Sequence, residues 1–100
     1  MVIDEQIAIE WARIPHFYYD FYVFQYATGF SAAVALAEKI LDEGEPAAER
    51  YIRFLSSGCT SDPITLLKGA GVDMTSPEPI RTALRLFDQL IDEFDSLMNS

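Results

Sequence analysis

The chain has 100 residues, half of them hydrophobic, and a formal net charge of −9 at neutral pH. This length predicts one domain, and the acidic balance disfavours both the phosphate backbone of nucleic acids and anionic membrane surfaces. Because Cys59 is the only cysteine, no internal disulfide can form, and we expect a reducing, cytoplasmic compartment.

The first expected helix covers residues 4–13 and ends because Pro15 pushes the residue before it out of the helical region. A longer helix is expected from about His16 to about Asp42. Its residues 21–37 carry no charge, which approaches the length that spans a bilayer, roughly 17–25 residues. Since this stretch includes polar residues such as Gln25, we interpret it as a helix buried in protein.

Gly44 and Pro46 end that long helix, and the next one is expected over residues 45–55. Its predicted inner face consists of Tyr51, Ile52 and Leu55.

A short helix is expected over residues 64–69, with Asp62 as its N-cap and Pro63 at its first position. The last helix should be capped by Thr75 or Ser76.

That last helix is the clearest amphipathic segment, because apolar residues recur in it at spacings of three and four. The stripe comprises Ile80, Ala83, Leu84, Phe87, Leu90, Ile91, Phe94 and Leu97. Together the segments predict an all-α fold of about five helices, with residues 1–100 forming a single compact, bundle-like unit.

The stretch "IPHFYYDFYVFQYATG", residues 14–29, gathers four tyrosines and the only histidine. If residues 18–29 are helical, Tyr19, Tyr22 and Tyr26 share one face, opposite a row of phenylalanines. One interpretation is that both faces belong to the core, since aromatic side chains bury large areas. The other is that the phenols and the imidazole line a cleft, where they stabilise negative charge that develops on an oxygen during acyl transfer.

Three segments carry a resemblance to a known family: "EWARIPHFYYDFYVFQYATGFSAA", "RYIRFLSSG" and "LLKGAGVDMTSPEPI". Together they resemble the carboxy-terminal region of oligoendopeptidase F, a zinc metallopeptidase of the thimet-oligopeptidase superfamily. The resemblance implies a fragment of a larger helical shell around a deep channel. In such enzymes the zinc lies on an HExxH helix whose glutamate is the general base, and the substrates are short peptides.

The resemblance also implies roles for individual residues. It assigns catalytic roles to His16, Tyr19 and Tyr26, with Tyr26 as the expected donor to the oxyanion. His16 and Tyr19 would hold the substrate backbone or the same oxygen, and Tyr22 is a weaker, substrate-binding candidate. Because a regular helix separates positions 19 and 26 by about 10 Å along its axis, the two phenols are expected to differ in role.

The 100 residues contain no HExxH motif, and one histidine cannot form a two-histidine zinc site. No metal ligands are therefore assigned, zinc is not expected on this chain, and the chain alone is expected to be inactive. As a fragment it is expected to need the missing amino-terminal peptidase portion and to form homo-oligomers through exposed apolar surface. The alternatives are a non-catalytic acidic helical interaction module, or the complementing half of a split peptidase.

Overall fold

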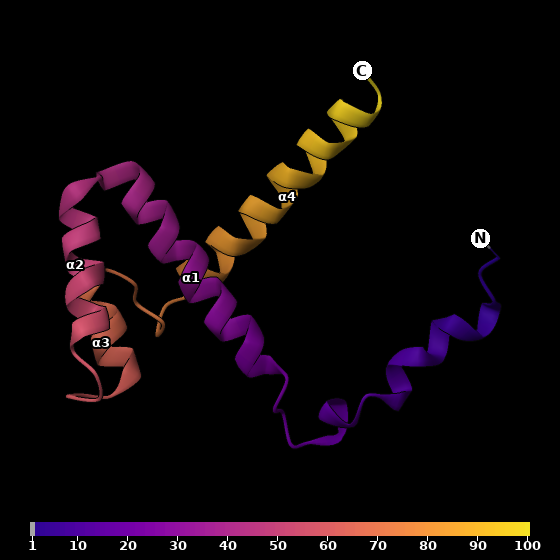
Figure 1. Ribbon diagram of the computed structural model, residues 1–100, viewed down its shortest axis with the longest axis horizontal. Helices are drawn as coiled ribbons and strands as arrows, with labels where there is room; N and C mark the ends of the chain where they lie inside the picture. Colours follow the sequence, from indigo (N-terminus) through magenta and orange to yellow (C-terminus); the bar gives the residue numbers. More distant parts are fainter. Residues whose placement is uncertain (1) are drawn as a thin grey trace.

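The computed structural model describes residues 2–100, and all regular secondary structure in that range is helical (Figure 1). The expected all-α class is therefore confirmed. Two 3₁₀ helices precede four α-helices: η1 (Glu5–Arg13), η2 (Pro15–Tyr18), α1 (Phe24–Glu43), α2 (Glu45–Ser56), α3 (Pro63–Gly69) and α4 (Glu78–Met98).

The long helix begins at Phe24, so the expectation that it starts near His16 is wrong. Phe21 has a φ of +57°, in the left-handed region, and a right-handed helix cannot continue through such a residue. The first expected helix also differs in kind, because residues 5–13 form a 3₁₀ helix. Its N-cap is Asp4, whose carboxylate accepts a hydrogen bond from the amide of Gln6 at 3.0 Å.

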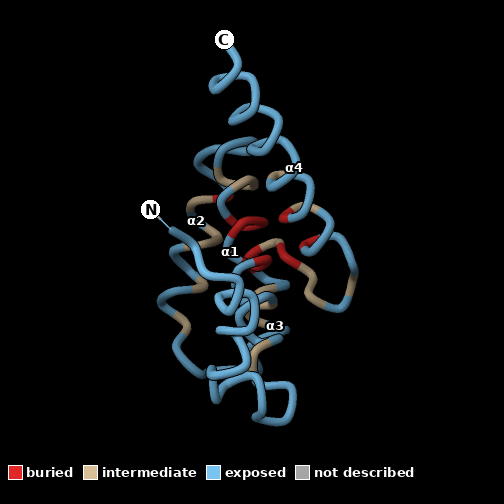
Figure 2. The backbone as a smooth tube through the Cα atoms, turned by 90° about the vertical axis from the view of Figure 1, so that its right-hand side faces the viewer, coloured by how far each residue is buried: buried red, intermediate tan, exposed pale blue. Residues whose placement is uncertain are grey.

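The core lies where α1, α2 and the segment after α3 meet (Figure 2). Ala35 and Leu36 of α1 pack there with Ala70 and Val72. Partly buried side chains close this core from the sides: Tyr51, Phe54, Leu67 and Met74. Small side chains such as Ala32 and Ala35 are buried on α1 and allow the neighbouring elements to approach closely.

Two predicted apolar faces match the buried surface only in part. In α2, Tyr51 packs against the core as predicted, but Ile52 and Leu55 are exposed and Ala47 is the buried residue. In α4 only Pro79 and Ala83 are buried, against α1, which α4 crosses (Figure 1). The other seven residues of the predicted α4 stripe are all exposed, from 49% to 71%: Ile80, Leu84, Phe87, Leu90, Ile91, Phe94 and Leu97.

The molecule is more open than the compact unit that we expected. Its radius of gyration is 17.9 Å, whereas a compact chain of this length has about 13 Å. The excess arises because α4 projects from its crossing with α1, and the N-terminal arm, residues 2–23, extends away from the first end of α1 (Figure 1). None of the helices in residues 2–100 combines the length and the hydropathy needed to traverse a lipid bilayer.

The turn between α1 and α2 is held by backbone conformation and by charge. Gly44 has a φ of +71°, which favours glycine, and its amide donates to the carbonyl of Ile40. Glu43 forms ion pairs with Lys39, at 3.5 Å, and with Arg50 of α2. The hydrogen bond from Arg50 holds the pKa of the Glu43 carboxyl below its ordinary value.

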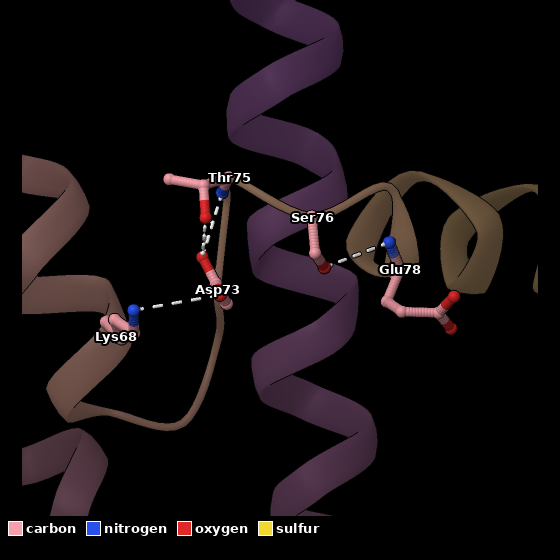
Figure 3. A network of polar contacts seen from close by, with 5 residues as sticks. All are labelled: Lys68, Asp73, Thr75, Ser76 and Glu78. Atoms are coloured by element: carbon pink, nitrogen blue, oxygen red, sulfur yellow. Dashed lines mark hydrogen bonds and ion pairs between the residues drawn. The ribbon is translucent and has the colours of Figure 1, made fainter.

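Side-chain hydrogen bonds fix the start of α3 and the segment that joins α3 to α4. Asp62 caps α3 as predicted, accepting from the amide of Thr65 at 3.0 Å. The Asp73 carboxylate accepts from the amide of Thr75 at 2.9 Å, and the Ser76 hydroxyl accepts from the amide of Glu78. Figure 3 shows both hydrogen bonds. Position 77, a proline, is the N-cap of α4, so the expected cap at Ser76 or Thr75 lies one or two residues too early.

Candidate functional site

Four aromatic side chains that the sequence singled out lie together, and we call them the His–Tyr cluster: His16, Tyr19, Tyr22 and Tyr26. The His16 ring is 5.8 Å from the ring of Tyr19 and 5.7 Å from that of Tyr22, measured between centroids. The Tyr26 ring lies 5.7 Å from Tyr22, edge to face. The structure thus brings together the four residues that the sequence analysis singled out.

The interrupted helix is what assembles the cluster. His16 belongs to η2, Tyr19 and Tyr22 lie in the turn around Phe21, and Tyr26 lies in the first turns of α1. Because Tyr19 is not on α1, the expected axial separation of about 10 Å between positions 19 and 26 does not apply. The turn instead sets the ring of Tyr19 6.3 Å from that of Tyr22.

The hydroxyls of Tyr22 and Tyr26 are 3.1 Å apart and form a hydrogen bond in which either oxygen can donate. The pKa of Tyr26 is raised above its ordinary value, mainly because of this hydrogen bond. The phenol therefore keeps its proton throughout the neutral range. Tyr26 is 62% exposed and Tyr19 is 55% exposed, so neither hydroxyl is sealed in a core. The cluster is therefore a set of accessible hydrogen-bond donors.

Two further aromatic contacts, which the sequence interpretation did not include, hold η1 and η2 together within the N-terminal arm. The Tyr18 hydroxyl donates to the carbonyl oxygen of Ala12 at 2.8 Å, which ties η2 to η1. Trp11 packs edge to face on Phe17 with 6.3 Å between ring centroids. In each contact the two partners are six residues apart, a spacing that does not correspond to a helical repeat. The high density of aromatic residues was therefore the only sign of these contacts in the sequence.

The described residues do not provide a zinc site. In residues 2–100 no three histidine, cysteine, aspartate or glutamate side chains are grouped so that they could hold a metal ion. His16 has the aromatic rings of Tyr19 and Tyr22 beside it, and Cys59 is exposed in the loop after α2. The cluster offers three phenols and a single imidazole, a set that suits hydrogen bonding to an oxygen and not coordination of zinc.

An apolar groove lies between α1, α2 and α3, about 430 Å³ in volume. Its α1 side is formed by small residues, including Gly29 and Ala33, and its other side by Tyr51, Phe54 and Leu67. This groove does not include the His–Tyr cluster.

In a comparison with known protein families, residues 1–86 match the family model described as peptidase family M3. Oligopeptidase PepF of Bacillus subtilis is 59% identical over 98 residues, which is 98% of this chain and 15% of the relative. The plasmid-borne oligoendopeptidase F of Lactococcus lactis subsp. cremoris is 45% identical over 93 residues, 93% of this chain and 16% of the relative.

Two solved structures share the fold. The crystal structure of oligoendopeptidase-F from Enterococcus faecium matches with a TM-score of 0.79 and 49% identity, covering 96% of this chain and 18% of that one. A putative peptidase from Chlamydophila abortus matches with a TM-score of 0.76 and 47% identity, covering 97% and 16%. The chain thus spans less than a fifth of the length of each relative.

Proposed function

The chain belongs to peptidase family M3, and from this premise we propose that it supplies one wall of the active site of a peptidase that hydrolyses short peptides. The relatives named above are oligopeptidases and oligoendopeptidases, and the whole chain aligns with a small part of each. In this proposal residues 1–100 act as a single structural unit. The zinc implied by the resemblance would be held by residues outside this chain, since the described residues do not fit it.

The single observation that carries the proposal is the exposed phenol of Tyr26, which is hydrogen-bonded and protonated at neutral pH. Such a group can donate to the oxygen of a peptide carbonyl as negative charge develops there. His16 and Tyr19 belong to the same cluster, so in this proposal they hold the substrate backbone beside that oxygen. Tyr26 is therefore assigned as oxyanion donor, with His16 and Tyr19 as substrate-holding residues.

In this proposal the chain alone does not hydrolyse peptides, and it requires a portion that bears HExxH. The test combines the purified chain with the Bacillus subtilis PepF relative from which the matching segment has been removed, and follows cleavage of a quenched fluorescent peptide. We expect hydrolysis only in the mixture. Tyr26→Phe should lower kcat about 100-fold to 1,000-fold, which is the usual effect of removing one oxyanion donor.

The matched control is Tyr51→Phe, which removes a phenol hydroxyl from the core region outside the cluster. It should leave the rate of the mixture unchanged. Equal rates for the Tyr26→Phe and unsubstituted chains in the mixture would contradict the assignment. Zinc-dependent cleavage by the chain alone, above that of its Tyr26→Phe variant, would contradict the proposed inactivity.

The second candidate function is an acidic helical interaction module, and the open apolar face of α4 favours it. This candidate needs no phenol row beside a histidine. The neighbouring coding sequence separates the possibilities: an in-frame HExxH upstream supports a peptidase fragment, and a separate gene with HExxH supports a split peptidase. The absence of HExxH from the neighbouring genes supports the interaction module.

A further inference from the structure

We infer that Tyr22 is a positioning residue, whose ring packs on His16 and whose hydroxyl holds the hydroxyl of Tyr26 in place. The inference rests on the proposed function for what the positioned hydroxyl does. It differs from the substrate-binding role that the resemblance implies for Tyr22, because here Tyr22 acts through Tyr26 and need not touch the substrate.

Tyr22 occupies the centre of the His–Tyr cluster. Its ring is 5.7 Å from His16 in a stacked arrangement, 6.3 Å from Tyr19, and 5.7 Å from Tyr26. Among the described residues Tyr22 is the only aromatic partner of Tyr26, so Tyr26 joins the cluster through Tyr22 alone. Tyr22 is also the least exposed of the three phenols, at 37%.

The hydroxyl pair has a direct consequence for hydrogen bonding. In the free chain, donation from Tyr26 to Tyr22 favours the neutral phenol and raises its pKa. Each phenol has one O–H, so when a substrate oxygen accepts the proton of Tyr26, the pair reverses and Tyr22 donates to Tyr26. A donor that itself accepts a hydrogen bond is polarised and donates more strongly. The bond also restricts rotation of the exposed Tyr26 side chain, and placement of a catalytic group within about 1 Å governs its effect.

The first experiment uses the chain by itself and does not depend on activity. Tyrosines labelled with ¹³C at the ring carbon that bears the hydroxyl are titrated by NMR, and Tyr26 is assigned from its Phe variant. In Tyr22→Phe the ring remains and the hydroxyl is lost, so we expect the pKa of Tyr26 to fall toward its ordinary value. Tyr19→Phe, which removes a hydroxyl that does not contact Tyr26, should leave that titration unchanged.

The second experiment uses the reconstituted peptidase and separates positioning from substrate contact. Tyr22→Phe should lower kcat about 10-fold with little change in KM, because the hydroxyl contributes through the orientation of Tyr26. The double variant Tyr22→Phe/Tyr26→Phe should be no slower than Tyr26→Phe alone. Independent losses that multiply in the double variant would overturn the inference and favour direct substrate contact.

The two experiments fail in distinguishable ways. If the unsubstituted chain does not reconstitute hydrolysis, the proposed function fails, and the NMR titration alone still decides the link between Tyr22 and Tyr26. If Tyr26 titrates identically in the unsubstituted chain and in Tyr22→Phe, the positioning role is wrong whatever the activity. Circular dichroism that matches the unsubstituted chain ensures that each variant is compared in the same fold.

Discussion

Phe21 is the residue on which the geometry of the His–Tyr cluster depends. Its φ of +57° lies within the turn between η2 and α1, and this turn sets His16 beside Tyr22. Left-handed backbone costs a residue with a Cβ about 1–2 kcal/mol. The Phe21 side chain is 86% exposed, so packing within this chain does not offset that cost.

Replacing Phe21 with glycine is expected to preserve and strengthen the turn, because glycine adopts positive φ without a steric penalty. Phe21→Val should weaken it, since β-branched residues are especially disfavoured there. The ratio of chains with His16 packed on Tyr22 to chains without this contact should differ about 5-fold to 30-fold between the two variants, as 1–2 kcal/mol implies. Nuclear Overhauser contacts between the His16 and Tyr22 rings measure that population.

The contact should therefore persist in Phe21→Gly and fade in Phe21→Val. Equal contacts in both variants would show that the turn does not depend on the left-handed residue. If α1 extended toward residue 16 in solution, the Phe21→Val variant would gain helicity by circular dichroism, in keeping with the helix that the sequence predicted.

For single residues, the sequence indicated which side chains form the cluster but not the backbone conformation that brings them together. His16, Tyr19, Tyr22 and Tyr26 could be selected from their chemistry, their spacing and the family resemblance. The break at Phe21 could not be predicted, because positive φ is usually signalled by glycine or asparagine and phenylalanine signals nothing of the kind. The link between Tyr22 and Tyr26 does survive a shift in helix start, because these two residues are four apart.

Among the elements, the segment that connects α3 to α4 contributes more to the core than its loop-like sequence indicates. Val72 is 1% exposed and Ala70 is 2% exposed, and both pack against Ala35 and Leu36 of α1. Hydrogen bonds of Asp73 with Thr75 and of Ser76 with Glu78 hold the backbone that follows (Figure 3). The loop thus packs against α1 and leads into the start of α4.

Val72→Ala is expected to destabilise the chain by about 1.5–2.5 kcal/mol, because it removes two buried methyl groups and leaves a cavity. Urea unfolding followed by circular dichroism measures the change. The matched control is Leu41→Ala, an aliphatic truncation at an 83% exposed position of α1, which should alter stability by no more than about 0.5 kcal/mol. Equal effects of the two substitutions would show that the loop does not contribute to the core.

Helix limits were more predictable than helix faces. The bounds of α2 and α3 follow closely from Gly44, Asp62 and Pro63, because caps and proline act locally. The buried side of each helix depends on which partner packs against it, and apolar periodicity does not name the partner. In α4 the periodic stripe is correct as a pattern, yet Ala83 is its only member that is buried within this chain.

The N-terminal arm and most of α4 are exposed (Figure 2), and both parts carry many large apolar side chains. On α4 the exposed residues recur at spacings of three and four along nearly its whole length. Apolar surface on this scale is rare in monomers and indicates association. In the relatives more than four fifths of the chain lies outside the matched segment, and in the proposed peptidase that portion would cover this surface.

For the chain by itself we expect a second copy to cover the face of α4, and Phe87→Ser/Phe94→Ser to abolish the resulting dimer or higher oligomer. These two phenylalanines are 62% and 65% exposed, and burying one such side chain contributes about 1.5–3 kcal/mol. In a two-fold dimer each substitution counts twice. The loss, about 6–12 kcal/mol at most, is comparable with the 8.2 kcal/mol that corresponds to a micromolar Kd.

Light scattering at micromolar concentration measures the mass. Asp88→Ser/Asp95→Ser is the matched control, because it changes the next residue along in each case and leaves the apolar stripe intact. It should keep the oligomer, and because each copy carries a formal charge of −9, the reduced repulsion should favour association slightly. A monomer mass for the unsubstituted chain, or the same mass for both double variants, would show that the face of α4 does not drive self-association.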